Sequence, residues 1–474
     1  MLLVKSIIPK KIKTLYCFRL AIVVLLTTAF SPAFSQDNSP YSRYGLGDLI
    51  PPGNIVNRGM GGLSAGYTDF LSVNFSNPAS YSSFIAGYQA KSKKVSSGRA
   101  ILDLGINIDN RSLKDNSVAG KFTASNAVFS YVQVGLPIRR NWGMSFGLRP
   151  ISRISYKLFR NERLFDPITG DPIDSASTRF EGDGGAYLAS LGTGFSLFHR
   201  QKKGMDEKLS IGINGGYLFG RKDHSTKRSL INDTVAYYQA NYETRTNYGS
   251  LYASVGFQYQ VPLSEANKIM LTIGAYGNWS QHLNARQDVL RETFIYDDNL
   301  GDVRLDSVSD TKDVKGKIIL PASYTAGFVL QKFSVPSKEG GWLIGVDFEQ
   351  ENWSQYRIYG QSDSVQNRWQ VRVGAQLSPV PKRNYWSNVV YRFGFYTGPD
   401  YIKVGQKLNQ IGATIGMGLP ISGRGQAVSQ FSLINLAFEY SKRGNNSNLL
   451  RENMFRFSIG FSLSDIWFVK RKYD

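Results

Sequence analysis

The sequence is poor in the residues that form disulfides and metal sites. It has 474 residues but a single cysteine, Cys17, which lies in an N-terminal segment that we expect to be removed. The three histidines, His199, His224 and His282, lie far apart and have no partners at ligand spacing. The spacing therefore supports neither a zinc site nor a Ser-His-Asp triad. We predict a non-enzymatic protein with no metal and no cofactor.

Long apolar runs are also missing from residue 37 onward. No segment there has the ~18 consecutive apolar residues of a membrane helix. The negative mean hydropathy does not exclude a membrane β-barrel, because each barrel strand is apolar on one face only and its connections are polar. Hydropathy alone would therefore miss such a barrel.

Residues 1–36 have the pattern of a secretory signal peptide. Five positive charges precede the apolar run Leu20–Leu26, and small residues around Ala33 follow it, so we predict cleavage near Ser35 or Gln36. The alternative of a retained anchor helix needs a run of ~20 apolar residues, and this run is shorter. A lipoprotein is also disfavoured, because Cys17 precedes the apolar run instead of closing it.

The chain is basic. Removal of the five charges of the leader lowers the formal net charge from +20 to +15. Nucleic acid is a poor partner for an exported chain, and many of the cations fall in expected turns. Contact with anionic lipid headgroups or with an acidic periplasmic partner explains these turns better. They are Arg139-Arg140, Lys202-Lys203, Lys382-Arg383 and Lys470-Arg471-Lys472.

Apolar residues alternate with polar or small ones through much of the chain. In Met454–Leu463, for example, Phe455, Phe457 and Phe461 share one parity, whereas Arg456, Ser458 and Gly460 share the other. A strand that separates lipid from a wet or plugged lumen has this pattern. Fourteen such segments can be recognised: 102–109, 126–138, 142–157, 181–199, 208–221, 251–259, 268–281, 317–333, 342–348, 369–377, 391–395, 406–420, 430–442 and 454–463.

The connections between these segments alternate in length. Short turns are expected near 137–141, 200–207, 262–267, 335–340, 379–387 and 422–429, and longer loops at 111–125, 157–180, 222–246, 283–316 and 352–366. We therefore predict an all-β fold, a transmembrane antiparallel β-barrel of about 14 strands in the cell outer membrane. Residues 83–466 form the barrel, residues 467–474 a periplasmic C-terminal tail, and both termini face the periplasm.

A soluble β-sandwich is the alternative interpretation of repeated amphipathic strands. In a sandwich the polar parity would be buried in a packed core, at a large free-energy cost for its charges, whereas a lumen tolerates them. The predicted lumen residues include Asp103, Asp347, Arg372, Arg392, Glu439 and Arg456. Tryptophans such as Trp142 and Trp353 near strand ends also favour an aromatic girdle.

Residues 37–82 differ from the rest of the chain. The segment is rich in Gly, Ser, Asn and Pro and lacks a sustained parity, but its interspersed Tyr, Leu, Phe and Ile side chains disfavour a disordered tail. We predict an N-terminal hatch that plugs the lumen. Its glycines Gly59, Gly61 and Gly62 follow no strand and have no acidic partner downstream, so we expect close backbone packing instead of a phosphate site.

The stretch Gly59–Gly66 together with Asn74, Asn77, Pro78 and Ala79 resembles the N-terminal region of the FadL family of outer-membrane transport proteins. The resemblance implies a fourteen-stranded barrel with an N-terminal hatch. In that family hydrophobic cargo enters from outside, sits beside the hatch and leaves through a kink in the third strand. The two ends of the mature chain look like those of a Bacteroidota branch with PorV-like relatives, whose members often work as subunits of larger assemblies.

The third predicted strand contains Gly147 and Pro150. Proline removes a donor from the ladder, so a bulge or break is expected there, either as a lateral window or as a rim bulge with no transport role. Asn77-Pro78-Ala79 is expected to pin the hatch. The acidic loop 283–316 lacks the ligand pattern of a calcium site and is expected to be a solvated loop.

Two functions follow from these predictions. The first is a passive conduit or carrier for hydrophobic small molecules, with a continuous apolar pocket beside the hatch. The alternative is a non-enzymatic barrel subunit of an outer-membrane protein secretion or barrel-assembly complex, in which paired charges fill the lumen. The expected partners are outer-membrane lipids, a hydrophobic ligand, or outer-membrane and periplasmic proteins, but not nucleic acid.

Overall fold

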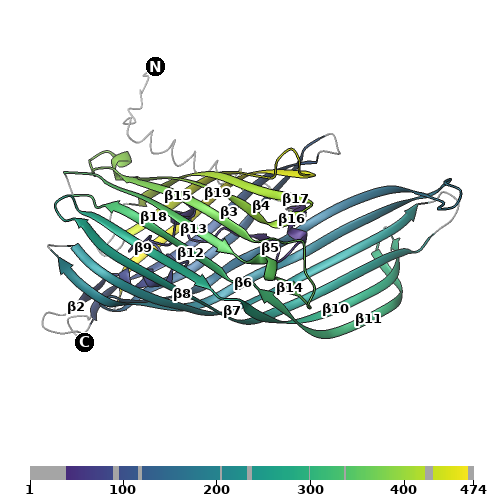
Figure 1. The fold of residues 1–474 in the computed structure, drawn as a ribbon, viewed down its shortest axis with the longest axis horizontal. Coiled ribbons are helices and arrows are strands. Elements are labelled where there is room, and N and C mark those ends of the chain that lie inside the picture. Colours follow the sequence, from purple (N-terminus) through teal and green to yellow (C-terminus); the bar gives the residue numbers. More distant parts are fainter. Residues whose placement is uncertain are drawn as a thin grey trace, which may run out of the picture.

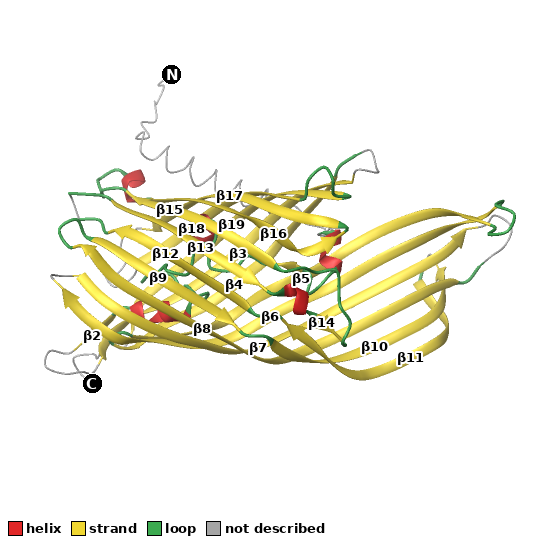
Figure 2. Ribbon diagram, in the orientation of Figure 1, coloured by secondary structure: helices red, strands yellow, loops and turns green. Residues whose placement is uncertain are grey.

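The chain folds into a closed antiparallel β-barrel in a computed structural model (Figures 1 and 2). The structure describes residues 39–88, 95–115, 120–202, 205–231, 237–297, 299–335, 338–421 and 431–467. The predicted leader 1–36, tail residues 468–474 and the expected turn at 422–429 lie outside these residues. No helix of the described part has the length and apolarity needed to cross a membrane.

Fourteen strands form the wall, as the alternating pattern predicts. The wall elements are β3 (Val95–Asp115), β4 (Phe122–Arg139), β5 (Trp142–Phe165), β6 (Pro172–Lys202), β7 (Met205–Ile231), β8 (Gln239–Ser264), β9 (Ile269–Asn278), β10 (Gln281–Asp297), β11 (Gly301–Leu320), β12 (Ser323–Lys332), β13 (Gly341–Glu351), β14 (Arg357–Ile358), β15 (Arg368–Ser378), β16 (Val390–Val404), β17 (Gln406–Ile421), β18 (Phe431–Arg443) and β19 (Leu450–Trp467). Three pairs of these elements are consecutive parts of one wall strand. β9 and β10 lie along the same neighbour, β8, and β11 and β12 lie in turn along β10 and β9. β13 and β14 likewise lie along β12 and β11.

The last strand closes the barrel on the first. β19 pairs with β3 from Leu450↔Asp115 to Trp467↔Gly98. Side chains of β19 alternate between outside and inside as predicted. Phe455 points outward and is 63% exposed, whereas Arg456 points inward and is 5% exposed. An apolar exterior around a polar interior fits a strand between lipid and a filled lumen.

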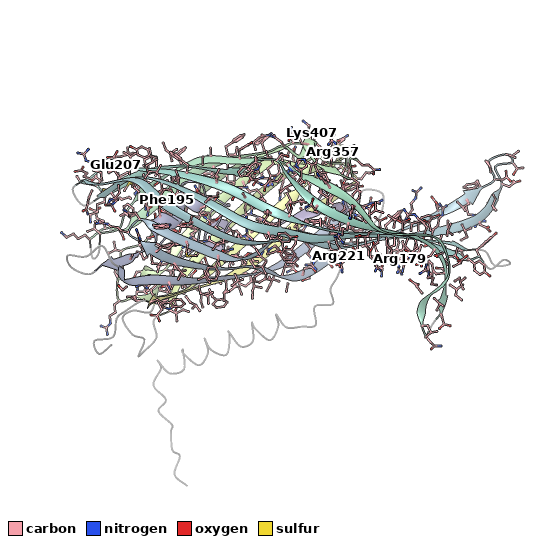
Figure 3. The ribbon with its side chains drawn as sticks, turned by 90° about the horizontal axis from the view of Figure 1, so that it is seen from below. Arg179, Phe195, Glu207, Arg221, Arg357 and Lys407 are labelled. Atoms are coloured by element: carbon pink, nitrogen blue, oxygen red, sulfur yellow. The ribbon has the colours of Figure 1, made fainter. Side chains whose placement is uncertain are left out.

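The expected long loops at 157–180, 222–246 and 283–316 are mostly β-hairpins, so this prediction was wrong. Strands β5, β6, β7, β8, β10 and β11 continue past the rim and form a projecting sheet on one side of the barrel (Figure 1). Figure 3 shows the barrel narrowing into this sheet near Arg179 and Arg221. The alternation gave no signal there, because most residues of 301–316 in β11 are exposed and none of them is buried.

The N-terminal segment 39–84 lies inside the barrel. It contains the 3-10 turns η1 (Pro40–Arg43) and η2 (Pro78–Ser83), the short strand β1 (Asp48–Leu49) and the helix α2 (Ile55–Gly59). Strand β2 (Ala86–Tyr88) then pairs with β3.

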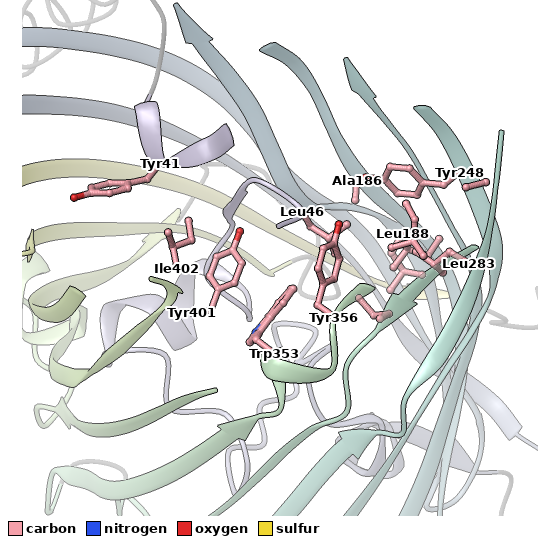
Figure 4. Close-up of a cluster of buried hydrophobic side chains, with 14 of the residues drawn as sticks. Tyr41, Leu46, Ala186, Leu188, Tyr248, Leu283, Trp353, Tyr356, Tyr401 and Ile402 are labelled. Atoms are coloured by element: carbon pink, nitrogen blue, oxygen red, sulfur yellow. The ribbon is translucent and has the colours of Figure 1, made fainter. Parts of the chain in front are cut away.

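An apolar cluster joins this segment to the base of the projecting sheet. Leu46 and Tyr41 of the segment pack with Tyr401 and with residues of β6, β7, β8, β10 and β11 (Figure 4). Trp353 belongs to this cluster and is 4% exposed, so its predicted place in an aromatic girdle was wrong. Through this cluster the N-terminal segment packs against the strands from which the projecting sheet extends.

Candidate functional site

The helix α2 places the glycines of the segment against the wall. The Asn54 side chain caps the helix by accepting a hydrogen bond from Asn57 N (2.9 Å). Beyond the helix, Gly61 adopts φ +69°, and a Cβ there would lie 2.9 Å from Phe395 N. Only glycine combines this backbone conformation with so close an approach. Gly59 similarly lies against the Gly416 backbone, and Gly62 against the Arg372 side chain.

The Asn-Pro-Ala motif fixes the opposite end of the segment. Asn77 accepts a hydrogen bond from Ala79 N (3.1 Å) and donates to Ala65 O (2.7 Å) and to Phe257 O of β8 (3.1 Å). Pro78 opens η2, where its missing N–H is not needed. The motif thus links the segment to itself and to the wall, which is the structural role that its residue types indicate.

Asn74 supports the same arrangement. Its side-chain amide donates to Ser64 O (2.7 Å) and to Tyr67 O (2.9 Å). Both carbonyls belong to the stretch that follows the glycines. Asn74 therefore folds the segment back on itself inside the lumen.

Wall glycines make room for the segment. A Cβ on Gly274 of β9 would lie 1.9 Å from Ala65 O, and one on Gly394 of β16 would lie 2.0 Å from Gly61 N. Such distances are far below van der Waals contact. The backbones of the segment and the wall are therefore in direct contact, and any added side chain must displace one of them.

Inward carboxylates bind backbone amides of the segment. Asp347 Oδ2 accepts hydrogen bonds from Ser64 N (2.7 Å) and Ala65 N (2.9 Å). Asp103 Oδ2 accepts one from Val73 N (3.1 Å). These two predicted lumen residues hold the N-terminal segment in place.

Ion pairs occupy the remaining lumen. Arg372, 1% exposed, pairs with Glu349, and Arg368 Nη1 lies 2.9 Å from Glu351 Oε2. A second group on β3, β16, β18 and β19 contains Arg111, Asp400, Arg443 and Glu452, together with Asp48 of the N-terminal segment. Asp48 pairs with both Arg111 and Arg443. The segment is thus held by charge as well as by backbone contacts.

The predicted pairing of the lumen charges was only partly right. Arg456 pairs with Glu439 (3.3 Å) and Arg372 has an acidic partner, but Arg392 donates instead to the amide oxygens of Gln376 (2.9 Å) and Asn435 (3.1 Å). Asp103 likewise has no arginine partner among the described residues and accepts from Tyr131 Oη (3.2 Å) and Ser462 Oγ (3.2 Å).

Further lumen charges, such as Arg111 and Arg443, were absent from the predicted set although they share its inward parity. Arg111 lies eight residues from Asp103 on β3, and Arg443 lies four residues from Glu439 on β18. Their parity was the signal that could have identified them. Asp48 carried no such signal, because the N-terminal segment has no sustained alternation.

Two small cavities lie beside the described part of the segment. One of about 90 Å³ is lined by Asp48, Arg58, Arg111 and Arg443, and one of about 150 Å³ by Leu49, Ile50, Arg149, Tyr252, Tyr276 and Trp353. Pockets for drug-sized ligands usually span ~300–1,000 Å³. Neither cavity is a continuous apolar pocket of the kind that a carrier needs.

A seam opens in the wall at the predicted kink. β4 and β5 pair only from Arg139↔Trp142 to Val132↔Leu148, although β4 continues to pair with β3 as far as Phe122. Beyond the seam, β1 replaces β4 as the partner of β5, with Leu49 opposite Ser152. The seam is therefore partly filled by the N-terminal segment.

Proline causes the irregularity in β5. The β5–β6 register shifts between Pro150 and Ser152, which leaves Ile151 as the extra residue of a bulge. Gly147 lies just before the end of the β4 pairing, where a Cβ would come within 2.1 Å of Val132 O. Both predicted kink residues thus lie at the seam.

Catalytic and metal sites are not evident in the described residues. No three His, Cys, Asp or Glu side chains cluster there at metal-binding distances. His224 contacts the Tyr156 hydroxyl (2.6 Å), and His199 Nε2 lies 3.2 Å from Asp206 Oδ1. In neither contact does the histidine also hydrogen-bond to a serine of the described residues, as a Ser-His-Asp triad would require.

The BamG family model matches residues 12–474, nearly the whole chain. The chain belongs to the BamG family. No curated protein matches it. Among solved structures it is similar to a Pseudomonas aeruginosa FadL homologue, with 12% identity, a TM-score of 0.51, and coverage of 89% of this chain and 100% of the homologue.

A further similar structure is the Pseudomonas putida toluene transporter TodX. It is 14% identical, with a TM-score of 0.49, and the match covers 88% of this chain and 99% of TodX. At 12% identity the similarity to the FadL homologue establishes the barrel fold alone. The FadL homologue supports the predicted resemblance at the level of architecture.

Proposed function

We propose that the chain is a non-enzymatic barrel subunit of an outer-membrane protein secretion or barrel-assembly complex. The observation that carries the proposal is the filled lumen of the described residues: the ion pairs of Arg372, Arg443 and Arg456 and the bound segment 39–84 occupy it, and the two cavities beside the segment are small. A subunit that acts through its surface needs no open path. Membership of the BamG family gives independent support.

The projecting sheet is the surface best suited to a protein partner. It exposes large apolar side chains well beyond the apolar band of the barrel, including Phe159 (64%), Tyr238 (71%), Leu300 (78%) and Val308 (77%). We infer that these side chains contact a protein partner, because burial in an interface would remove their apolar surface from water. We propose that this end of the barrel faces outside and that both termini face the periplasm.

We propose the N-terminal segment as a fixed plug, because its contacts extend around the wall from β3 to β18. The Bacteroidota branch with PorV-like relatives remains a prediction from the ends of the mature chain. A conduit for hydrophobic small molecules is the second candidate, and the seam between β4 and β5 is the observation that favours it.

Purification from the native membrane in a mild detergent tests the proposal. We expect protein partners in fixed stoichiometry with the barrel. The matched variants Phe159→Asp/Tyr238→Asp on the projecting sheet and Tyr385→Asp/Trp386→Asp in the exposed turn at the opposite end of the barrel locate the interface. The first variant should lose partners while remaining folded, and the second should retain them. A barrel that purifies alone with a bound hydrophobic compound would overturn the proposal in favour of the conduit.

A further inference from the structure

Four cations gather on the outer face of the barrel at the ends of β3, β4, β18 and β19. We call Lys114, Lys121, Lys442 and Arg451 the cationic rim patch. They line a surface cavity of about 750 Å³, and its remaining lining residues are Ser112, Gly444, Asn445, Asn446, Ser447 and Asn453. No acidic side chain lines this cavity. It lies apart from the lumen and from the base of the projecting sheet.

The strand register brings like charges together in this patch. Arg451 of β19 lies directly opposite Lys114 of β3. The β3–β4 register, which ends at Leu113↔Phe122, brings Lys121 beside Lys114. Like charges directly opposite each other destabilise a strand pair. An anion placed between them would remove this repulsion.

No carboxylate of the described residues neutralises the patch. Arg451 donates to the amide oxygen of Asn446, and Lys442 lies 5.8 Å from the centre of the Tyr440 ring. Lys114 and Lys121 form no ion pair with any residue that the structure describes. Elsewhere at the surface, cations such as Arg221 and Arg286 do have acidic neighbours. The charge of the patch is therefore uncompensated.

An aromatic stripe lies directly below the patch on the outer face. The ring centroids of Tyr440 and Phe455 are 4.7 Å apart, and those of Phe438 and Phe457 are also 4.7 Å apart. Tyr440, Phe455 and Phe438 are 37%, 63% and 51% exposed. Apolar rings followed by cations toward the rim match the order of acyl chain and headgroup in a bilayer leaflet.

We propose that the cationic rim patch binds the phosphate of a membrane lipid headgroup, with an acyl chain of that lipid over Tyr440 and Phe455. Arginine and lysine suit phosphate because they offer charge-assisted donors, and the amides of Asn445 and Asn453 add neutral ones. This inference rests on the proposed membrane location of the barrel. It does not depend on a protein partner.

Native mass spectrometry of the purified barrel with dimyristoylphosphatidic acid tests the site. Lys114→Ala/Arg451→Ala should weaken lipid binding at least about tenfold, because the loss of one charge-assisted hydrogen bond already accounts for such a factor. The control Lys382→Ala/Arg383→Ala removes the same charge from an exposed turn at the opposite end of the barrel. It should bind the lipid as the unmodified protein does.

Two further probes distinguish the source of the phosphate. Millimolar inorganic phosphate should not displace the lipid, and dimyristoylphosphatidylcholine should bind more weakly because its choline offsets the phosphate charge. Equal lipid binding by the two double variants would overturn the proposal. Displacement by inorganic phosphate at the concentration of the lipid would also overturn it, since the patch would then be a site for an adventitious ion only.

The same variants separate this inference from the proposed function. Lys114→Ala/Arg451→Ala should recover the same protein partners as the unmodified barrel from native membranes. Failure to find any partner would contradict the proposed function and leave the lipid measurement intact. Unchanged lipid binding together with unchanged partners would contradict the lipid site alone.

Discussion

Arg456 of β19 forms a bidentate ion pair with Asp109 of β3 across the junction that closes the barrel. Arg456 Nε lies 2.7 Å from Asp109 Oδ1, and its Nη2 lies 2.9 Å from Oδ2. The two residues are direct register partners, and both are buried in the lumen. The ion pair therefore joins the first and last strands of the wall, whose pairing closes the barrel.

Arg456→Met should destabilise the closed barrel. Removal of one partner of a buried ion pair leaves an uncompensated charge and costs about 3–5 kcal/mol. Urea unfolding in detergent micelles measures the loss. Asp109→Leu/Arg456→Met should recover part of it, because the apolar pair removes the charge of Asp109, whereas buried Glu439 still loses Arg456 as its partner. A single variant as stable as the unmodified barrel would show that the pair has no role in closure.

Gly274→Ala should loosen the N-terminal segment. The added Cβ would lie 1.9 Å from Ala65 O, so either the wall or the segment must move, at a cost of about 1–3 kcal/mol. Hydrogen exchange at residues 55–66 should become faster. Gly215→Ala is the matched control, because its nearest neighbour, Leu191 O, is 4.0 Å away. Equal exchange in the two variants would contradict the proposed contact between segment and wall.

The region around His224 should become less stable in acid. His224 lies beyond the apolar band, at the base of the projecting sheet, and contacts the Tyr156 hydroxyl. Burial lowers its pKa to about 3; the neighbouring cations Lys222 and Arg43 act in the same direction and Asp363 opposes them. An opened state would bind a proton near the ordinary His pKa of about 6.5. Stability is therefore lost as the pH falls from about 6.5 toward 3.

Hydrogen exchange at residues 39–47 and 152–158 measures this dependence. After correction for intrinsic rates, protection should be lower at pH 5 than at pH 7.5. His224→Gln keeps a polar side chain but cannot be protonated, so its protection should not change between these pH values. A histidine-free variant with the same acid sensitivity would assign the effect to other groups.

The barrel strands could be predicted from the sequence because their environment changes at every residue. The alternation of apolar and polar residues over 102–109 or 454–463 follows from lipid on one side and a filled lumen on the other. Beyond the rim of the barrel this contrast disappears, since residues 301–316 of β11 are buried on neither face. The hairpins of the projecting sheet were consequently mistaken for loops.

The site could be predicted in part for a related reason. Parity identifies Asp347 and Arg372 as inward residues, but it does not identify their partners, which are distant in the chain. Asp347 binds the amides of Ser64 and Ala65, 283 and 282 residues away. Such contacts follow from the path of the N-terminal segment, and no local pattern specifies that path. The kink at Pro150 was predictable because its cause, a missing donor, is local.

A disulfide between β1 and β5 tests most directly whether the barrel works without opening. Leu49 and Ser152 are register partners, so Leu49→Cys/Ser152→Cys can lock the N-terminal segment to the wall. The one native cysteine, Cys17, lies in the predicted leader and should not interfere. If the barrel is a subunit with a fixed plug, the oxidised and reduced forms should recover the same protein partners and rescue a deletion strain equally. Loss of rescue on oxidation, with recovery on reduction, would contradict this account and indicate a hatch that must move.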